Sequence, residues 1–285
     1  TVPAVTEKHL LAIGPKCHVT CLDSQTGELR WAMDLVREYG TIVPPWYAGQ
    51  CPLIDEGRAI IAPGGPKALM IAVDCATGKI IWQSPNRRGW KMTHSSIMPM
   101  ELSGRRMYVY CADKGVVGVS AEDGRVLWEF DGWRIRIANI PSPVIIGDGR
   151  IFLSGGYNAG SMMIRVSAEG DKFAVEELFR LPAKVFGATQ QTPILYDGYL
   201  YGIRPNGELA CLDLSGKVVW TSGGGNKFGN GPLLIADGLL LVMDDHGALT
   251  LAEASPSGYA QLARAQVITH RRDGRTVGGH DSWAP

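Results

Sequence analysis

A repeated pattern of about eleven residues that ends in tryptophan constrains the fold more than any other feature. Each copy has an apolar pair, an Asp or small polar residue, a Gly-containing turn and an apolar run closed by Trp. The clear copies are CLDSQTGELRW (21–31), AVDCATGKIIW (72–82), GVSAEDGRVLW (118–128) and ACLDLSGKVVW (210–220), and the degenerate copies are IRVSAEGDKFAVEELF (164–179) and TLAEASPSGYAQLA (250–263). With Phe179 and Leu262 in the place of Trp, successive copies lie 41 to 51 residues apart. A period of this length indicates a repeat architecture.

A second pattern precedes each copy and completes the repeat. A run that begins with Pro is followed by a Gly turn and another apolar run, as in PVIIGDGRIFLSGG (143–156). Such turns between short apolar runs are hairpin signals, and no sustained helical periodicity is present. Four short strands per period predict an all-β fold, a β-propeller of four-stranded antiparallel blades. Six blades are expected, at residues 1–35, 46–84, 93–130, 137–180, 187–222 and 228–269. The segment HDSWAP (280–285) is predicted to be the first strand of a seventh blade.

The residues of the repeat favour a structural role over a ligand site. An Asp before a tight turn can accept backbone N–H groups, and Gly adopts a positive φ at low cost. A Trp on the outermost strand offers a large flat surface and an indole N–H that needs a partner, which the neighbouring blade can supply. The positions expected to dock one blade on the next are Asp23, Gly27, Trp31, Asp74, Gly78, Trp82, Gly124, Trp128, Asp213, Gly216 and Trp220.

The motif resembles the tryptophan-docking motif of the PQQ-like repeat family, named after the quinoprotein alcohol dehydrogenases. Ala72, Asp74, Gly78 and Trp82 match the family pattern position by position. The resemblance implies rings of seven or eight blades, so residues 1–285 are expected to be one propeller domain and a fragment of a longer chain. A six-bladed ring with a loose C-terminal tail is the alternative. The resemblance also implies a location outside the cytoplasm, in the periplasm or at the cell surface.

The resemblance covers catalytic and non-catalytic proteins, outer-membrane assembly lipoproteins being among those that bind no quinone. The alcohol dehydrogenases of the family hold PQQ with calcium and carry adjacent cysteines, whereas this chain has no Cys-Cys pair and no recurring cluster of acidic and Asn residues. We therefore expect no cofactor, catalytic residue or metal site. The leading hypothesis is a non-catalytic binding or scaffolding module. A quinoprotein-type oxidoreductase with PQQ and calcium, and a carbohydrate- or peptide-binding propeller, are the alternatives.

Two groups of residues are candidates for binding. The first group is expected to surround the mouth of the central channel, because each member precedes an innermost strand: Gln50, His94, Asn139, Gln191, Asn230 and His280. The second group lies in two links between blades, NRRGWK (86–91) and DGWRIR (131–136), where Arg88, Trp90, Trp133 and Arg134 have the composition of interface anchors. Hydrogen bonding among the channel residues, and packing of the two tryptophans beneath their loops, are the structural alternatives.

Charge and cysteine content give limited information about the class of binding partner and about the compartment in which the protein is located. Lys plus Arg and Asp plus Glu are both 28, with no like-charge block, so nothing favours a nucleic acid; a protein or small ligand is the expected partner. No apolar run is long enough to cross a membrane. Six cysteines are present, at 17, 21, 51, 75, 111 and 211. Buried free thiols are expected, with a Cys17–Cys51 bridge as the alternative.

Overall fold

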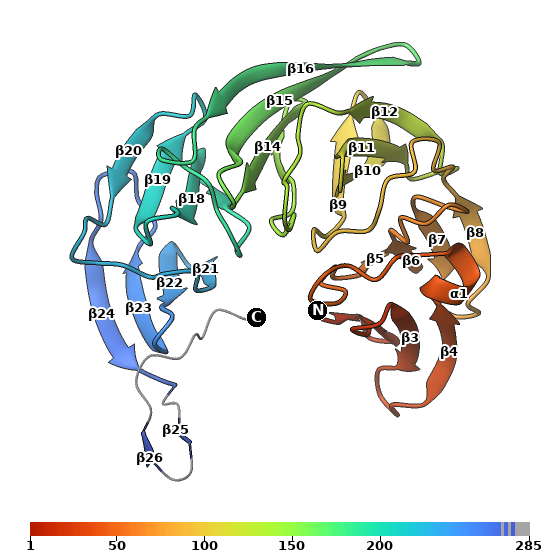
Figure 1. Ribbon diagram of the computed structural model, residues 1–285, viewed down its shortest axis with the longest axis horizontal. Coiled ribbons are helices and arrows are strands. Elements are labelled where there is room, and N and C mark those ends of the chain that lie inside the picture. Colours follow the sequence, from red (N-terminus) through yellow and green to blue (C-terminus); the bar gives the residue numbers. More distant parts are fainter. Residues whose placement is uncertain (269–270, 273–274, 277–285) are drawn as a thin grey trace. The chain divides into compact units, whose positions relative to one another are not determined.

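The computed structural model describes residues 1–268, 271–272 and 275–276, and almost all of its regular structure is β-strand. Within that part of the chain there are six four-stranded antiparallel sheets and one two-stranded hairpin. In each four-stranded sheet the strands are neighbours in chain order, so every sheet is a simple up-and-down meander (Figure 1). These six sheets confirm the all-β propeller fold and its four-stranded blades. The expected strand at 280–285, with His280, lies outside the described residues.

The first three sheets hold the first three copies of the repeat. The first consists of β1 (Ala4–Val5), β2 (His9–Ile13), β3 (His18–Asp23) and β4 (Leu29–Asp34). The second consists of β5 (Leu53–Asp55), β6 (Arg58–Ile61), β7 (Ile71–Asp74) and β8 (Ile80–Gln83). The third consists of β9 (Met98–Leu102), β10 (Arg105–Ala112), β11 (Gly115–Ser120) and β12 (Val126–Phe130). Each sheet lies inside the range expected for its blade.

The remaining strands follow the same order. The fourth sheet consists of β13 (Val144–Gly147), β14 (Arg150–Gly155), β15 (Gly160–Glu169) and β16 (Lys172–Leu181). The fifth consists of β17 (Ile194–Tyr196), β18 (Tyr199–Ile203), β19 (Leu209–Asp213) and β20 (Val218–Thr221). The sixth consists of β21 (Leu233–Ala236), β22 (Leu239–Met243), β23 (Ala248–Glu253) and β24 (Gln261–Gln266). The separate two-stranded hairpin consists of β25 (Arg271–Arg272) and β26 (Arg275–Thr276). The fourth sheet ends one residue beyond its expected limit.

One short helix, α1 (Leu35–Tyr39), was not expected, because five residues are too few to show a helical period. Its capping residues explain it. The side chain of Asp34 accepts the backbone N–H groups of Val36 and Arg37, and Gly40 ends the helix with φ 71°. Both are ordinary helix-ending devices.

The sheets share a local distortion at the repeat. In five of the described sheets the pairing of the third strand with the fourth shifts register at one point, for example between Cys21 and Leu22 and between Ala72 and Val73. An extra residue on one strand bends it and increases its twist. The shift precedes the turn of the motif in each case, so the repeat in sequence is also a repeat in backbone geometry.

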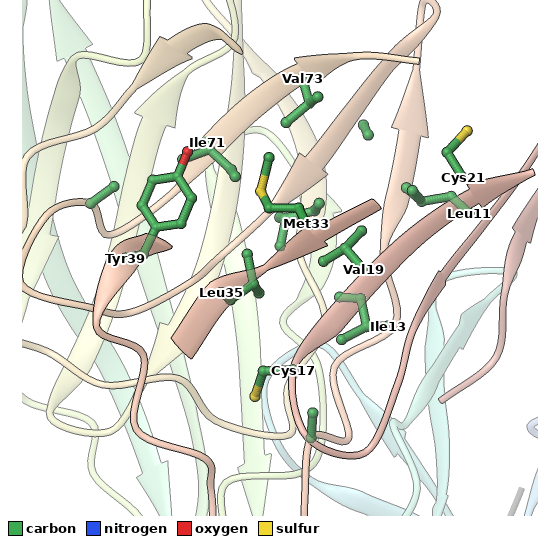
Figure 2. Close-up of a cluster of buried hydrophobic side chains, with 14 of the residues drawn as sticks. Leu11, Ile13, Cys17, Val19, Cys21, Met33, Leu35, Tyr39, Ile71 and Val73 are labelled. Carbon is green, nitrogen blue, oxygen red and sulfur yellow. The ribbon is translucent and has the colours of Figure 1, made fainter. Parts of the chain in front are cut away.

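The chain divides into two compact units, residues 1–153 with 164–177, and residues 154–163 with 178–285. In the first unit, one apolar cluster joins the first and second sheets: Val19 of β3 and Met33 of β4 lie with Ile71 and Val73 of β7 (Figure 2). A second cluster in that unit joins the second and third sheets. In the second unit, a cluster that includes Tyr201 and Leu240 joins the fifth and sixth sheets. Each core therefore lies between neighbouring sheets, as face-to-face packing of blades requires.

Candidate functional site

The acidic residues of the motif hold their own turns. Oδ1 of Asp74 accepts the backbone N–H and the hydroxyl of Thr77, both at 2.7 Å, and Oδ1 of Asp23 accepts the N–H groups of Gln25 and Thr26 at 2.9 Å. The N–H of Thr26, then that of Gln25, lowers the pKa of Asp23 to about 2. Each carboxylate accepts hydrogen bonds from its own turn, and these bonds keep it ionised. A carboxylate with a lowered pKa is a poor group for proton transfer near neutral pH.

The tryptophans of β4, β8 and β20 dock on the sheet that follows. The indole N–H of Trp31 donates to the carbonyl of Cys75 at 2.8 Å, that of Trp82 to Ala121 at 3.1 Å, and that of Trp220 to Ser255 at 2.8 Å. The rings of Trp31 and Trp82 also lie on the turn glycines of the next sheet. A Cβ atom added to Gly78 would lie 2.8 Å from the Trp31 ring, and one added to Gly124 would lie 2.5 Å from the Trp82 ring.

Trp128 departs from the expected docking. Its indole N–H lies 3.3 Å from the sulfur of Met107, in its own sheet. In the next sheet the degenerate copy of the motif lies in β15 and β16, which are ten residues long each, whereas a short turn from Asp to Gly joins the last two strands of the first, second and fifth sheets. Trp128 is buried with its indole N–H bonded inside its own sheet.

The residues expected at the channel mouth form hydrogen bonds near the start of their sheets. The amide of Gln50 bonds both the N–H and the carbonyl of Ala62, and that of Gln191 donates to the carbonyl of Ile203. Gln50 and Gln191 each tie the segment before an innermost strand to the end of the second strand of the same sheet. Asn230, in the second unit, is half-buried, and its backbone N–H donates to Asp245.

In the first unit the structure brings two of these residues together. The backbone N–H of His94 donates to the carbonyl of Asn139 at 3.1 Å, and Nδ2 of Asn139 donates to the carbonyl of Ala112 at 3.3 Å. Burial lowers the pKa of His94, although hydrogen bonds to the backbone of Pro45 and Tyr47 act in the opposite direction. His94 and Asn139 are therefore the two members of the group that share one site in this unit.

Trp90 and Trp133 are buried rather than exposed anchors, as in the alternative in which they pack beneath their loops. Their side chains are 3% and 1% exposed, respectively, because both pack beneath their loops. The guanidinium of Arg88 covers the ring of Trp90 at 5.5 Å from its centroid and forms an ion pair with Glu129 at 2.8 Å. Arg134 is exposed and donates from Nε to the carbonyl of Lys114. The arginines are accessible, but the tryptophans beside them are core residues.

A groove in the first unit is the strongest candidate for a binding site. We call it the interblade groove, since most of its lining comes from the links before β5, β9 and β13, together with the turn between β10 and β11. Its volume is about 800 Å³, in the range of ligand sites. The lining residues are Ile42, Val43, Pro44, Pro45, Lys91, Met92, Thr93, His94, Asp113, Lys114, Arg134, Ile135, Arg136, Ile137, Ala138 and Asn139.

Exposed apolar side chains lie at the groove and immediately after its Pro45 edge, and they were not among the residues expected from the sequence. Ile42 and Ile137 are 57% and 51% exposed, and Trp46 and Tyr47 are 69% and 56% exposed. Trp46 and Tyr47 also have positive φ values, of 61° and 72°, which bulky residues seldom adopt. The available signal was the sequence Pro-Pro-Trp-Tyr in a link that fits no strand pattern.

The acidic and thiol groups singled out below are either paired within the protein or buried. No group of three or more His, Cys, Asp or Glu side chains among them could hold a metal ion. The buried carboxylate of Asp244 is already bound by Arg264 and by the N–H groups of His246 and Ala248. The six cysteines are free, and burial raises the pKa of Cys17 to about 11 and of Cys75 to about 12, which disfavours reactive thiolates. Among the described helices none is long and apolar enough to cross a membrane.

The family model described as "Outer membrane protein assembly factor BamB" matches residues 1–222. The chain belongs to this family. Two relatives with the same name are similar to it: one from Moranella endobia (strain PCIT), 24% identical over 251 residues, and one from Yersinia pestis, 21% identical over 280 residues. These alignments include 83% and 94% of this chain, but 60% and 67% of the respective relatives, so the chain spans about two thirds or less of their length.

A solved structure gives the same answer for the fold. The crystal structure of BamB from Moraxella catarrhalis superimposes with a TM-score of 0.62 at 14% identity, covering 91% of this chain and 70% of that one. The likeness confirms the propeller fold of this BamB family member and the PQQ-like repeat that its motif indicates. At 14% identity, this likeness does not assign a role to any individual residue of the chain.

Proposed function

We propose that this chain is a non-catalytic scaffold that binds other proteins outside the cytoplasm and serves the assembly of outer-membrane proteins. The observation that carries the proposal is the interblade groove, where exposed apolar side chains lie beside exposed cationic ones that form no ion pair with any described residue. Exposed aromatic and basic side chains in one patch are typical of protein interfaces. The relatives are named as outer membrane protein assembly factors, which supports a role of this kind and an extracytoplasmic location, with the periplasm as the specific compartment proposed.

The proposal includes the absence of a quinone cofactor. PQQ in the family's dehydrogenases requires a calcium ion held by carboxylate and amide oxygens, and the described acidic residues do not fit such a site. Those of the motif instead bind the N–H groups of their own turns, and Asp244 is paired with Arg264. Adding PQQ with calcium to the purified chain should leave its visible absorbance unchanged and give no dye-linked alcohol oxidation. A stoichiometrically bound quinone, or turnover, would contradict the non-catalytic proposal.

The scaffold role can be tested by complementation. The chain, exported to the periplasm, is expressed in a bacterium that lacks its own BamB, and the amount of folded outer-membrane protein is measured. We expect the amount to rise above that of the strain with an empty vector. The same chain without an export signal is the matched control and should have no effect. An exported, folded chain that leaves the amount unchanged would refute the assembly role.

A further inference from the structure

Four cationic side chains surround the interblade groove without partners of opposite charge. Lys91, Lys114, Arg134 and Arg136 are all exposed, and within the described residues none of them forms an ion pair. Asp113 is the one acidic residue in the lining, and its carboxylate accepts the backbone N–H of Lys91 at 2.7 Å. The groove therefore has an excess of positive charge although the whole chain has none. Such a site attracts an anionic ligand.

The groove also contains an acceptor that no donor satisfies. Asn139 is 3% exposed, and its Oδ1 has no hydrogen-bond partner among the residues that the structure describes. The amide is held in place from its other side, where Nδ2 donates to the carbonyl of Ala112. A buried polar atom without a partner costs free energy of about 1–3 kcal/mol, so it favours a ligand that brings a donor. A backbone N–H of a bound peptide is such a donor.

Apolar side chains lie in the groove and directly after its Pro45 edge, although Tyr47 itself lines a separate hollow with Pro15, Lys16 and His18. Ile42 and Pro45 line the groove, and Trp46 and Tyr47 directly follow Pro45. The left-handed backbone of Trp46 and Tyr47 is held by hydrogen bonds on both sides, from the N–H of Tyr47 to Pro44 and from the N–H of Ala48 to Pro15. The aromatic pair is consequently presented to solvent by a fixed turn. Rigid exposed aromatic side chains are the usual anchors of protein interfaces.

We propose that the interblade groove binds an extended acidic segment of a partner protein, with acidic and apolar side chains at alternate positions. Successive side chains of an extended strand point to opposite sides, so the acidic side chains can pair with the exposed cations while the apolar ones contact Ile42 and Ile137 of the lining and Trp46 beside Pro45. A backbone N–H of the segment donates to Oδ1 of Asn139. This inference rests on the proposed function, since it names the surface and the partner chemistry of the scaffold.

The test uses the full chain and fluorescently labelled octapeptides, with binding followed by anisotropy. One pool alternates Asp or Glu with Leu, Val or Phe; a second has Lys in place of the acids, and a third has Ser in place of the apolar residues. We expect the first pool to bind at least about tenfold more tightly than either control pool, and its affinity to fall as salt rises. Equal affinity for the three pools would overturn the proposal.

Variants locate the binding on the chain. Arg134→Glu combined with Arg136→Glu should weaken binding of the acidic pool by at least about tenfold, and Trp46→Ala by a similar factor. Lys172→Glu, an exposed residue of β16 outside the groove, is the matched control and should leave binding unchanged. Retained affinity in both groove variants would overturn the assignment. Tighter binding of an anionic polysaccharide than of the acidic pool would overturn the peptide in favour of a glycan.

The complementation and peptide-binding experiments together distinguish a failure of this inference from a failure of the proposed scaffold role. If the charge-reversed groove variant still restores outer-membrane proteins in the complementation experiment, the groove is not the surface that the scaffold uses and the inference fails alone. If the unaltered chain binds the acidic pool but restores nothing, the groove stands and the assembly role fails.

Discussion

The docking turns and the interblade groove use the same residue types in opposite ways. At the turns, Trp82 is buried, its N–H is bonded to Ala121, and its ring covers Gly124. Beside the groove, Trp46 is exposed on a left-handed backbone, and within the groove Oδ1 of Asn139 has no hydrogen-bond partner among the described residues. The first region has its polar groups satisfied by the protein itself, whereas the second leaves apolar surface and an acceptor for something else. A tryptophan in this fold therefore has a structural role where its ring is buried and its N–H is bonded within the protein, and is a candidate for binding where its ring is exposed.

The largest effect should come from Trp82→Ala, which would remove a buried ring, its hydrogen bond and the contact with Gly124. A loss of about 3–5 kcal/mol in the free energy of unfolding is expected, as for other buried aromatic residues. Urea denaturation followed by circular dichroism measures it. A loss below about 1 kcal/mol would mean that the motif does not hold the second and third sheets together.

Gly124→Ala isolates the close approach of ring and turn. Gly124 has φ 74°, and an added Cβ would lie 2.5 Å from the Trp82 ring, so we expect a loss of about 2–4 kcal/mol from strain and steric conflict. Gly104→Ala is the matched control, because Gly104 has φ 73° and no atom within 4 Å of an added Cβ. It should lose only about 1–2 kcal/mol. Equal losses in the two variants would contradict the docking contact.

The docking turns could be predicted from the sequence, because the residues that form each turn are close together in the chain. Asp74, Gly78 and Trp82 are fixed by turn chemistry and by a repeat that places the same contact in several sheets. Burial of Trp90 and Trp133 could not be read in this way, because it depends on segments distant in sequence, such as Gly115, which packs against the Trp90 ring. The sequence singled out three residues of the groove lining, His94, Arg134 and Asn139, whereas Trp46 beside the groove lies in a link without any repeat.

Trp128 shows where the repeat misleads. Its own copy of the motif is regular, but docking needs a partner turn in the next sheet, and that sheet has the long β15–β16 hairpin. Asp171, between these strands, forms an ion pair with Arg105, and the Arg105 guanidinium lies 5.7 Å from the centroid of the Phe173 ring. Contacts of this kind join the hairpin to the third sheet without the tryptophan. Docking of a tryptophan depends both on its own copy of the motif and on the copy in the next sheet, so one copy alone does not predict the contact.

A smaller effect is expected from the turn carboxylates, and it depends on pH. The side chain and then the backbone N–H of Thr77 hold the pKa of Asp74 below its ordinary value. Its contribution is therefore present above about pH 4, where the carboxylate is charged in both states, and is lost as the pH falls through the folded pKa. Asp74→Asn should cost at most about 1 kcal/mol at pH 7, because the group is in contact with water.

The measurement for Asp74 is urea denaturation of the unaltered chain and of Asp74→Asn at pH 7 and at about pH 2.5. The difference in the free energy of unfolding should shrink at the lower pH, because Asp74 of the unfolded chain then binds a proton more readily than Asp74 of the folded chain, and this favours unfolding of the unaltered chain. A difference that is the same at both pH values would show that the charged carboxylate does not stabilise the turn.

The most direct test of the contrast between the two regions is one pair of measurements on Trp46→Ala. The variant should unfold within about 0.5 kcal/mol of the unaltered chain, as an exposed residue does, while its affinity for the acidic and apolar peptide pool falls by at least about tenfold. Trp46 would then be a binding residue in a fold held together by other tryptophans. A variant that loses stability and keeps its affinity would contradict the account.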